Sequence, residues 1–224
     1  RLDGRVEVET TPKDGDDVAV GDVLAMVTGP ARPILVGERS ALNLIGHLSG
    51  IASLVRTYAR VVRDNRCVLV DTRKTLPGLR SLEKYAVRVG GGSNHRFGLF
   101  DGILVKDNHI VAAGSVTQAT KRARAGSALP VQVECTNEGE VNEALDAGAH
   151  AILLDNQETA ELARLTKLIK VRSEHVLVEA SGGITIDNVA EVAATGVDRI
   201  SIGAFTHSAP ALDISMKLTK VWES

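Results

Sequence analysis

A cluster of basic side chains occupies one stretch of the sequence, between residues 73 and 106. This stretch holds seven Lys or Arg and two acids, Glu83 and Asp101, although the whole chain carries a net charge of −2. The seven are Arg73, Lys74, Arg80, Lys84, Arg88, Arg96 and Lys106. A solvated basic face is the plain structural interpretation of such a run. These cations flank strand-like runs and turn residues instead of forming a helical stripe, so the pattern favours a site for a polyanionic small molecule.

The elements that must position these cations alternate between short apolar runs and helical segments from residue 67 onward. The strand-like runs are 67–70, 103–105, 131–133, 151–154, 176–178 and 199–202, and the helical segments lie near 79–89, 115–125, 137–147, 157–170 and 185–195. Six β-then-α steps predict parallel strands with right-handed crossovers. Open doubly wound sheets and barrels both satisfy this pattern, and six strands fall short of the eight in a complete barrel.

The sequence before residue 67 divides into a β-rich part and a long helix. Residues 1–37 have Gly-Asp turns between short apolar runs. Apolar residues then recur every three or four positions, which predicts a helix with Ser40 as its N-cap. We assign residues 38–66 to this linking helix and residues 67–224 to the barrel domain. The chain opens on Arg1 within a pattern, so we expect further residues upstream.

The bulk composition excludes several classes of function. Hydrophobic residues make up 44% of the 224 residues and aromatic residues 3%, so the core is built from Val, Ile, Leu and Ala. Few aromatic side chains and a slightly acidic balance argue against a nucleic-acid partner. No run approaches the ~18 apolar residues of a membrane span. The two cysteines, Cys67 and Cys135, lie in apolar strand-like runs, which is typical of a reducing cytosol and predicts a cytoplasmic location.

Polar residues or glycines follow nearly every predicted strand, at the end where parallel β/α folds bind their ligands. In chain order the strands end in Asp71, Arg73 and Lys74; in Lys106, Asp107, Asn108 and His109; in Glu134; in Asp155 and Asn156; in Ser181, Gly182 and Gly183; and in Gly203 and Ala204, with His207 soon after. A purely structural barrel would not need this arrangement. We therefore expect these residues to converge in one site.

A phosphate site is predicted after the fifth strand. Ser181, Gly182 and Gly183 lead into a helix whose predicted N-cap is Thr185. Unhindered backbone N–H groups at a helix N-terminus bind phosphate, and Gly203 from the next strand could complete the site. The structural alternative is two tight turns.

Carboxylates and cations at the other strand ends predict further binding groups. Glu134 and Asp155 end neighbouring strands, which suits Mg²⁺ held through oxygen or water, although either carboxylate alone could equally be structural. Arg73, Arg96 and Lys106 offer fork and point-charge donors for carboxylates and phosphates.

The histidines, a cysteine and a glycine run are weaker signals. His95 and His207 are each, taken alone, more often structural than functional. Strand alternation aims Cys135 at the face opposite Glu134, which argues against a nucleophile. The glycines at 90–92 follow a helix rather than a strand, so they are no dinucleotide fingerprint. We interpret them as a flexible loop that lets His95 and Arg96 approach a ligand.

A series of motifs runs along the chain in a fixed order. These motifs are Glu38-Arg39-Ser40-Ala41-Leu42-Asn43-Leu44, Asp71-Thr72-Arg73-Lys74-Thr75, Gly90-Gly91-Gly92-Ser93-Asn94-His95-Arg96, Lys106-Asp107-Asn108-His109, Val133-Glu134, Leu154-Asp155-Asn156 and Glu179-Ala180-Ser181-Gly182-Gly183. In this order they closely resemble the quinolinate phosphoribosyltransferase family. The resemblance covers the chain from about residue 36 to its end and extends to the preceding strands.

The resemblance implies a fold and an activity. The fold is α/β, an incomplete (open) parallel α/β barrel with a small, truncated N-terminal α/β sandwich portion, onto which the C-terminal end can pack back. The activity is phosphoribosyl transfer from phosphoribosyl pyrophosphate (PRPP) to quinolinate with decarboxylation. Mg²⁺ would bind with PRPP, with no organic cofactor and no nucleic-acid or membrane partner. A homodimer is implied, in which Arg39 reaches the partner's site.

The resemblance also implies roles for single residues. Arg73, His95, Arg96 and Lys106 would hold the two carboxylates of quinolinate, while Lys74 and Lys106 would contact PRPP. Glu134 and Asp155 would take Mg²⁺ and the ribose hydroxyls, and Ser181, Gly182, Gly183, Gly203 and His207 would line the phosphate pockets. Lys74, Lys106, Glu134 and Asp155 form the predicted catalytic set.

Two other functions stay open at this point. One is a related phosphoribosyltransferase with another acceptor, such as nicotinate without decarboxylation. The other is a non-catalytic barrel that binds a phosphorylated metabolite. An aldolase-type barrel is disfavoured, since no lone Lys sits deep in an apolar strand poised for a Schiff base.

Overall fold

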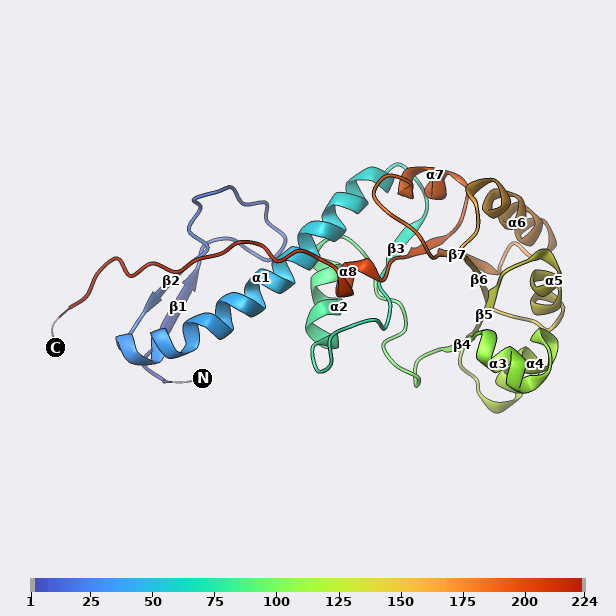
Figure 1. Cartoon of the computed structure of the whole chain (residues 1–224), viewed down its shortest axis with the longest axis horizontal. Helices are drawn as coiled ribbons and strands as arrows, with labels where there is room; N and C mark the ends of the chain where they lie inside the picture. Colours follow the sequence, from blue (N-terminus) through green and yellow to red (C-terminus); the bar gives the residue numbers. More distant parts are fainter. Residues whose placement is uncertain (1–2, 223–224) are drawn as a thin grey trace.

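The computed structural model describes residues 3–222, which form an elongated molecule with a β-hairpin at one end and a β/α body at the other (Figure 1). The elements in chain order are β1 (Glu7–Thr10), β2 (Ala25–Thr28), α1 (Ala31–Val62), β3 (Val68–Val70), α2 (Arg80–Val89), β4 (Ile103–Val105), α3 (Asp107–Ala113), α4 (Val116–Gly126), β5 (Val131–Cys135), α5 (Glu138–Asp146), β6 (Ala151–Asp155), α6 (Thr159–Arg172), β7 (Leu177–Ser181), α7 (Val189–Ala194), β8 (Arg199–Ser201) and α8 (Ala204–His207).

Six parallel strands form a curved sheet in the order β3-β8-β7-β6-β5-β4. Helices α7, α6, α5 and α4 lie along its outer side (Figure 1). Among the strands of residues 3–222, the edge strands β3 and β4 pair with β8 and β5 and not with each other, so the barrel stays open between them, and a single bridge joins Val70 of β3 to Ser93. The predicted incomplete parallel α/β barrel is confirmed, and all six of its predicted strands are present.

The two faces of this sheet differ in chemistry because strand residues alternate between them. Outward-facing residues such as Val133, Ile152 and Ile200 belong to the aliphatic core beneath the helices. Inward-facing residues include the buried polar side chains Gln132 and Glu179. The inner face is therefore a polar lining rather than a second apolar core.

Helix α1 connects the hairpin to the barrel, and it begins earlier than predicted. Its first residue is Ala31, with Pro30 as the N-cap, whereas the sequence pattern placed the N-cap at Ser40. Pro33 is compatible with this start, because the first-turn N–H groups of a helix have no intrahelical acceptor. The prediction of a β-rich segment up to residue 37 is thus wrong for residues 31–37, which form about the first two turns of α1.

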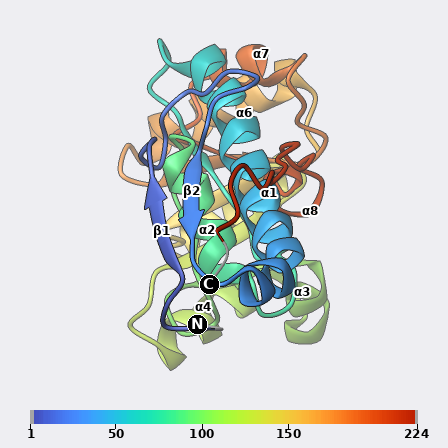
Figure 2. The ribbon, with the colours of Figure 1, turned by 90° about the vertical axis from the view of Figure 1, so that its left-hand side faces the viewer.

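The chain after α8 runs back along α1 toward the hairpin (Figures 1 and 2). The Leu212 N–H donates to the Gly46 carbonyl at 2.9 Å. A Cβ at Gly50 would collide with the Pro210 carbonyl oxygen, so glycine is required for this close approach. The C-terminal segment therefore joins the two ends of the molecule.

Two short helices, α3 and α8, were not predicted, since each falls within a segment assigned to a strand end. None of the helices in residues 3–222 combines the length and the apolar character that crossing a bilayer requires.

Candidate active site

The strand register aligns the carboxyl ends of the sheet along one edge. Val105 lies opposite Val133, and Asp155 lies opposite Ser181, which in turn lies opposite Ser201. Residues that directly follow these positions therefore meet at the same edge, as the sequence predicted from the parallel topology.

Lys106 and Glu134 form an ion pair at this edge. The Lys106 Nζ lies 2.7 Å from the Glu134 Oε2, and the two side chains are 46% and 14% exposed. Lys106 is also the N-cap residue of α3, and its backbone N–H donates to Nδ1 of His109 at 3.0 Å. The helix start thus fixes the backbone from which the Lys106 ammonium reaches the site.

Asp155 and the glycine turn after β7 lie next to each other. Asn156 donates from Nδ2 to the Asp155 Oδ2 at 2.6 Å, and its backbone N–H donates to the Ser181 carbonyl at 2.9 Å. A Cβ at Gly182 would collide with the Asn156 side chain, and the φ of Gly182 is +87°. This position therefore requires glycine for both backbone and packing reasons.

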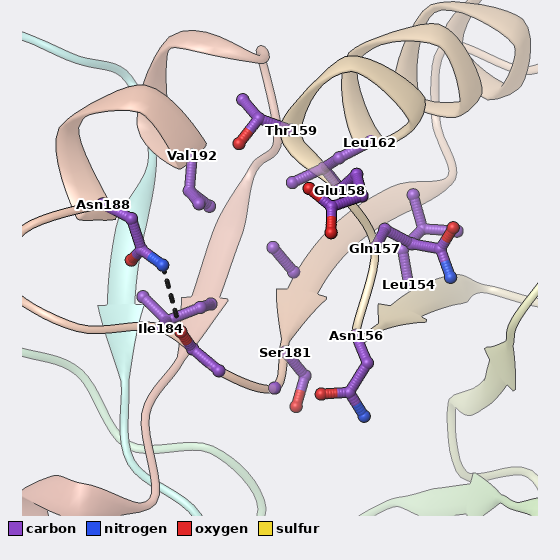
Figure 3. A pocket seen from close by; sticks show the side chains of 13 residues that line it. Leu154, Asn156, Gln157, Glu158, Thr159, Leu162, Ser181, Ile184, Asn188 and Val192 are labelled. Carbon is purple, nitrogen blue, oxygen red and sulfur yellow. Dashed lines mark hydrogen bonds between the residues drawn. The ribbon is translucent and has the colours of Figure 1, made fainter.

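A cavity of about 220 Å³ lies behind this turn, and Ser181, Gly182 and Gly183 line it (Figure 3). Asn188 donates to the Gly183 carbonyl at 3.0 Å and closes one side. Helix α7 begins at Val189 with Asn188 as its N-cap, so the predicted N-cap at Thr185 is wrong. The turn can offer backbone N–H groups, but it is not itself the start of a helix.

Lys74, Gly203 and His207 come together at the neighbouring edge of the sheet. A Cβ built on Gly203 would lie 3.0 Å from Lys74 Cδ and 3.1 Å from His207 Nε2. The Thr206 hydroxyl donates to the Lys74 carbonyl at 2.8 Å and ties the loop after β3 to α8. Because Gly203 has no side chain, Lys74 and His207 can both pack against it and lie close to each other.

Arg73 and Arg96 are close enough to repel each other. Burial, helped by the positive charge of Arg73, lowers the pKa of Arg96 below its ordinary value. The Arg96 Nη1 donates to the Gly102 carbonyl at 3.0 Å, which holds the guanidinium in place. Neither guanidinium forms an ion pair within residues 3–222, although Asp101 partly offsets the charge at Arg96, so an anionic ligand would stabilise the two cations.

The segment that carries His95 and Arg96 is held by a buried ion pair that sequence reasoning missed. Asp71 and Lys84 are 0% and 2% exposed and contact each other directly. Asp71 also accepts from the His95 N–H at 2.9 Å, and Lys84 donates to the His95 carbonyl at 3.0 Å. Burial raises the pKa of Asp71, while Lys84 and these hydrogen bonds act in the opposite direction.

The predicted flexible loop at residues 90–92 is instead a tightly packed turn. A Cβ at Gly90 would lie 2.5 Å from the Ala52 carbonyl of α1, and a Cβ at Gly92 would lie 2.9 Å from the Val87 side chain. These glycines permit close packing against two helices, which makes the approach to His95 rigid.

A second buried network on the inner face was also missed. Gln132 donates to Glu179 at 3.0 Å, and Arg199 lies 3.1 Å from the same carboxylate oxygen. His95 Nε2 lies 3.0 Å from the Gln132 Oε1 and 3.3 Å from Glu179. The sequence feature that could have revealed this network is the placement of polar residues, such as Gln132 and Glu179, between apolar residues of the strands.

Arg39 stands apart from these groups. It lies on the half of α1 that runs beside the hairpin (Figure 1), and its side chain is 74% exposed with Glu38 at 3.8 Å. The strand ends bring Lys106 to Glu134, Asp155 to the turn at Ser181, and Lys74 to Gly203 and His207, and the loop after α2 carries His95 and Arg96. Arg39 lies outside these groups.

The donor set fits Mg²⁺ shared with a substrate. Within residues 3–222, no group of three or more His, Cys, Asp and Glu forms a metal cluster. Glu134 and Asp155 nevertheless lie on adjacent strands and face the same side of the sheet, because Glu134 pairs with Leu153, two residues before Asp155. Mg²⁺ commonly takes one or two carboxylates and completes its shell with waters and substrate phosphates.

The fold and the site define a class: α/β-barrel enzymes that bind phosphorylated, anionic substrates at the carboxyl ends of their strands. Two family models match the chain, "Quinolinate phosphoribosyl transferase, N-terminal domain" over residues 2–49 and "Quinolinate phosphoribosyl transferase, C-terminal domain" over residues 51–217. The chain belongs to the quinolinate phosphoribosyl transferase family.

Similar proteins come from bacteria and animals. The chain is 48% identical over 225 residues to the "Probable nicotinate-nucleotide pyrophosphorylase [carboxylating]" of Bacillus subtilis, covering 100% of this chain and 77% of that protein. It is 45% identical over 199 residues to the human "Nicotinate-nucleotide pyrophosphorylase [carboxylating]", covering 87% and 67%. The crystal structure of NadC from Streptococcus pyogenes matches with a TM-score of 0.89 at 43% identity, covering 96% and 76%.

Proposed function

We propose that this protein transfers phosphoribose from PRPP to quinolinate, with loss of CO₂, to give nicotinate mononucleotide and pyrophosphate in NAD biosynthesis. Membership of the family supports this activity. The observation that carries it is the ion pair of Lys106 with Glu134 at the carboxyl edge of the sheet, and the charges of Arg73 and Arg96, which act on each other, support it. Several cations there match a substrate pair that brings two carboxylates and several phosphate groups.

The transfer step follows from the charges that develop during the reaction. The pyridine nitrogen forms a bond to C1 of the ribose while the bond from C1 to the pyrophosphate oxygen breaks, and the electron pair leaves with pyrophosphate. Lys74 and Lys106 would stabilise the negative charge on the leaving group, and the carboxylates of Glu134 and Asp155 would stabilise the positive charge on the ribose. These four residues remain the predicted catalytic set.

Decarboxylation then needs no organic cofactor. The ring nitrogen is cationic once it carries the ribose, so the bond to the adjacent carboxylate can break with its electrons left on the ring carbon. CO₂ leaves, and the carbon takes a proton from solvent. Arg73 and Arg96 would hold the carboxylates in position, while Ser181, Gly182, Gly183, Gly203 and His207 would line the phosphate pockets.

Glu134 and Asp155 are the residues that would hold Mg²⁺. When bound, this ion would neutralise pyrophosphate charge as a Lewis acid. The Lys106 side chain, which is 46% exposed and paired with Glu134, would also be able to reach a substrate phosphate.

We further propose a homodimer in the cytoplasm, in which Arg39 is contributed to the partner's site. The exposed position of Arg39 on α1, away from the other cations, supports a role across an interface. Mixing Arg39→Ala and Lys106→Ala proteins should restore part of the activity that each lacks, since one site in a mixed dimer would be intact. Mixtures as inactive as either parent would count against the shared site.

The assay for the activity measures pyrophosphate and CO₂ released from quinolinate and PRPP in the presence of Mg²⁺. Nicotinate in place of quinolinate serves as the comparison substrate. Equal rates with nicotinate would favour the related phosphoribosyltransferase, and binding without pyrophosphate release would favour a metabolite-binding barrel.

A further inference from the structure

His95 was predicted to bind a substrate carboxylate, but both of its ring nitrogens face protein groups. Its Nδ1 receives the Arg96 backbone N–H at 2.7 Å, and its Nε2 lies 3.0 Å from the Gln132 Oε1. The side chain is only 12% exposed. A ring in this position is poorly placed to donate to a substrate.

The protonation of the ring follows from its partners. A backbone N–H can only donate, so Nδ1 of His95 must carry a lone pair. The proton of a neutral imidazole then resides on Nε2, where the oxygens of Gln132 and Glu179 accept it. An imidazolium would place a second hydrogen against the Arg96 N–H.

The orientation of Gln132 agrees with this assignment. Its Nε2 lies 3.0 Å from the Glu179 Oε2, and an ionised carboxylate can only accept. The amide oxygen must therefore face His95. Burial raises the pKa of Glu179, but the hydrogen bond from His95, the positive charge of Arg199 and the hydrogen bond from Gln132 lower it, and the net pKa lies below its ordinary value of 4.5.

Each residue of the network therefore orients the next one, from Arg199 to Arg96. Arg199 holds the Glu179 carboxylate at 3.1 Å, Glu179 orients Gln132, and Gln132 fixes Nε2–H of His95. The other ring nitrogen then fixes the backbone of Arg96. The backbone of His95 is clamped independently by Asp71 and Lys84, and its ring links Gln132 of the sheet to the backbone of Arg96.

We propose that His95 is a positioning residue: its neutral imidazole, held by Gln132 and Glu179, fixes the backbone of Arg96 and does not itself bind the pyridine carboxylates. This inference rests on the proposed function for the identity of the substrate. It adds Gln132, Glu179 and Arg199 to the machinery of quinolinate recognition, acting through His95 and Arg96.

The direct test is the ring nitrogen spectrum of His95 in ¹⁵N-histidine-labelled protein near neutral pH. The His95 signal is identified by its change in Glu179→Gln and its loss in His95→Asn. We expect the neutral Nε2–H form both in the free protein and with quinolinate bound. An imidazolium or Nδ1–H form in the free protein, or conversion to imidazolium when quinolinate binds, would overturn the proposal.

Kinetics of Glu179→Gln provide a second readout. This variant keeps the side-chain shape but weakens the hold on Gln132, so the KM for quinolinate should rise roughly tenfold, as for one charge-assisted hydrogen bond lost. The KM for PRPP should change less than about twofold on the same reasoning. A quinolinate KM equal to that of the unaltered protein would contradict the positioning role.

Thr166→Val is the matched control, because Thr166 is 3% exposed and its hydroxyl has no hydrogen-bond partner among residues 3–222. It removes a buried polar atom outside the site and should leave both KM values unchanged. If the unaltered protein shows no turnover of quinolinate, the proposed function fails. The free-protein spectrum of His95 would still decide the network by itself.

Discussion

The two faces of the six-stranded sheet are built from the same strands yet have opposite chemistry. The outer face contributes aliphatic side chains such as Val131, Ile152 and Val178, each 0% exposed beneath the helices. The inner face contributes Gln132, Glu179 and Arg199, linked by hydrogen bonds and ion pairs. Because residues alternate along each strand, the outer-facing residues mainly stabilise the fold and the inner-facing residues mainly serve ligand binding. Substitutions on the outer face should therefore lower stability, and substitutions on the inner face should lower activity.

The largest expected effect comes from removing a cation at the rim of the inner face. Arg73→Ala and Lys106→Ala should each lower turnover of quinolinate by at least ~10²-fold, the scale of one lost electrostatic donor. Steady-state assays with saturating PRPP measure this, and the thermal unfolding midpoint should stay near that of the unaltered protein. Lys121→Ala, an exposed cation on α4, is the control. Nearly normal rates in either variant would refute the assignment.

The next effect concerns the outer face. Ile152→Ala should lower the free energy of unfolding by about 2–5 kcal/mol, because it leaves a cavity in close-packed aliphatic surroundings. Urea denaturation measures this loss. The rate per folded molecule should hardly change, and a large fall in that rate would show that the two faces are not separable.

A smaller effect concerns pH. The pKa of Glu179 is lower in the folded protein than in the unfolded chain, so the unfolded chain binds more protons around the ordinary value of 4.5. The stability from this carboxylate is present above that value and is lost as pH falls through the folded pKa. Glu179→Gln should therefore flatten the acid side of a plot of unfolding free energy against pH. If the acid side of this plot were the same in Glu179→Gln, groups other than Glu179 would account for the loss of stability at low pH.

The smallest effect is expected at Cys135, on the outer face of β5. Burial, followed by the nearby carboxylates of Glu140, Glu134 and Glu143, raises the pKa of this thiol far above its ordinary value. It should stay unmodified by a thiol reagent in the native protein, while the half-buried Cys67 reacts first. Cys135→Ala should keep turnover within about twofold of the unaltered protein, in line with a packing role. Inactivation that tracks Cys135 labelling would contradict this.

The sequence was sufficient to predict the six barrel strands and the edge of the sheet at which their carboxyl ends meet. Apolar runs such as residues 103–105 stand out from their polar surroundings, and parallel topology places their carboxyl ends together. Cys135 faces away from the site, as strand alternation predicted. Such local patterns survive folding because each depends on a few neighbouring residues.

Contacts between distant strands could not be obtained in the same way. The network of Gln132, Glu179 and Arg199 depends on strand register, which no local pattern encodes. The glycines at 90–92 looked flexible because their packing partner, α1, lies far away in sequence. The start of α1 was missed because an early proline breaks the apolar stripe but not the helix.

The pairing of the first barrel strand with the last has a consequence for synthesis. Val68 of β3 lies opposite Arg199 of β8, so β3 lacks this strand neighbour until residue 199 has left the ribosome, although Ser93 pairs with its other edge earlier. Closing so long a loop is entropically costly and slows folding. During that interval the edge of β3 that later pairs with β8 is exposed, and a nascent chain arrested before β8 would be prone to chaperone binding or aggregation at this edge.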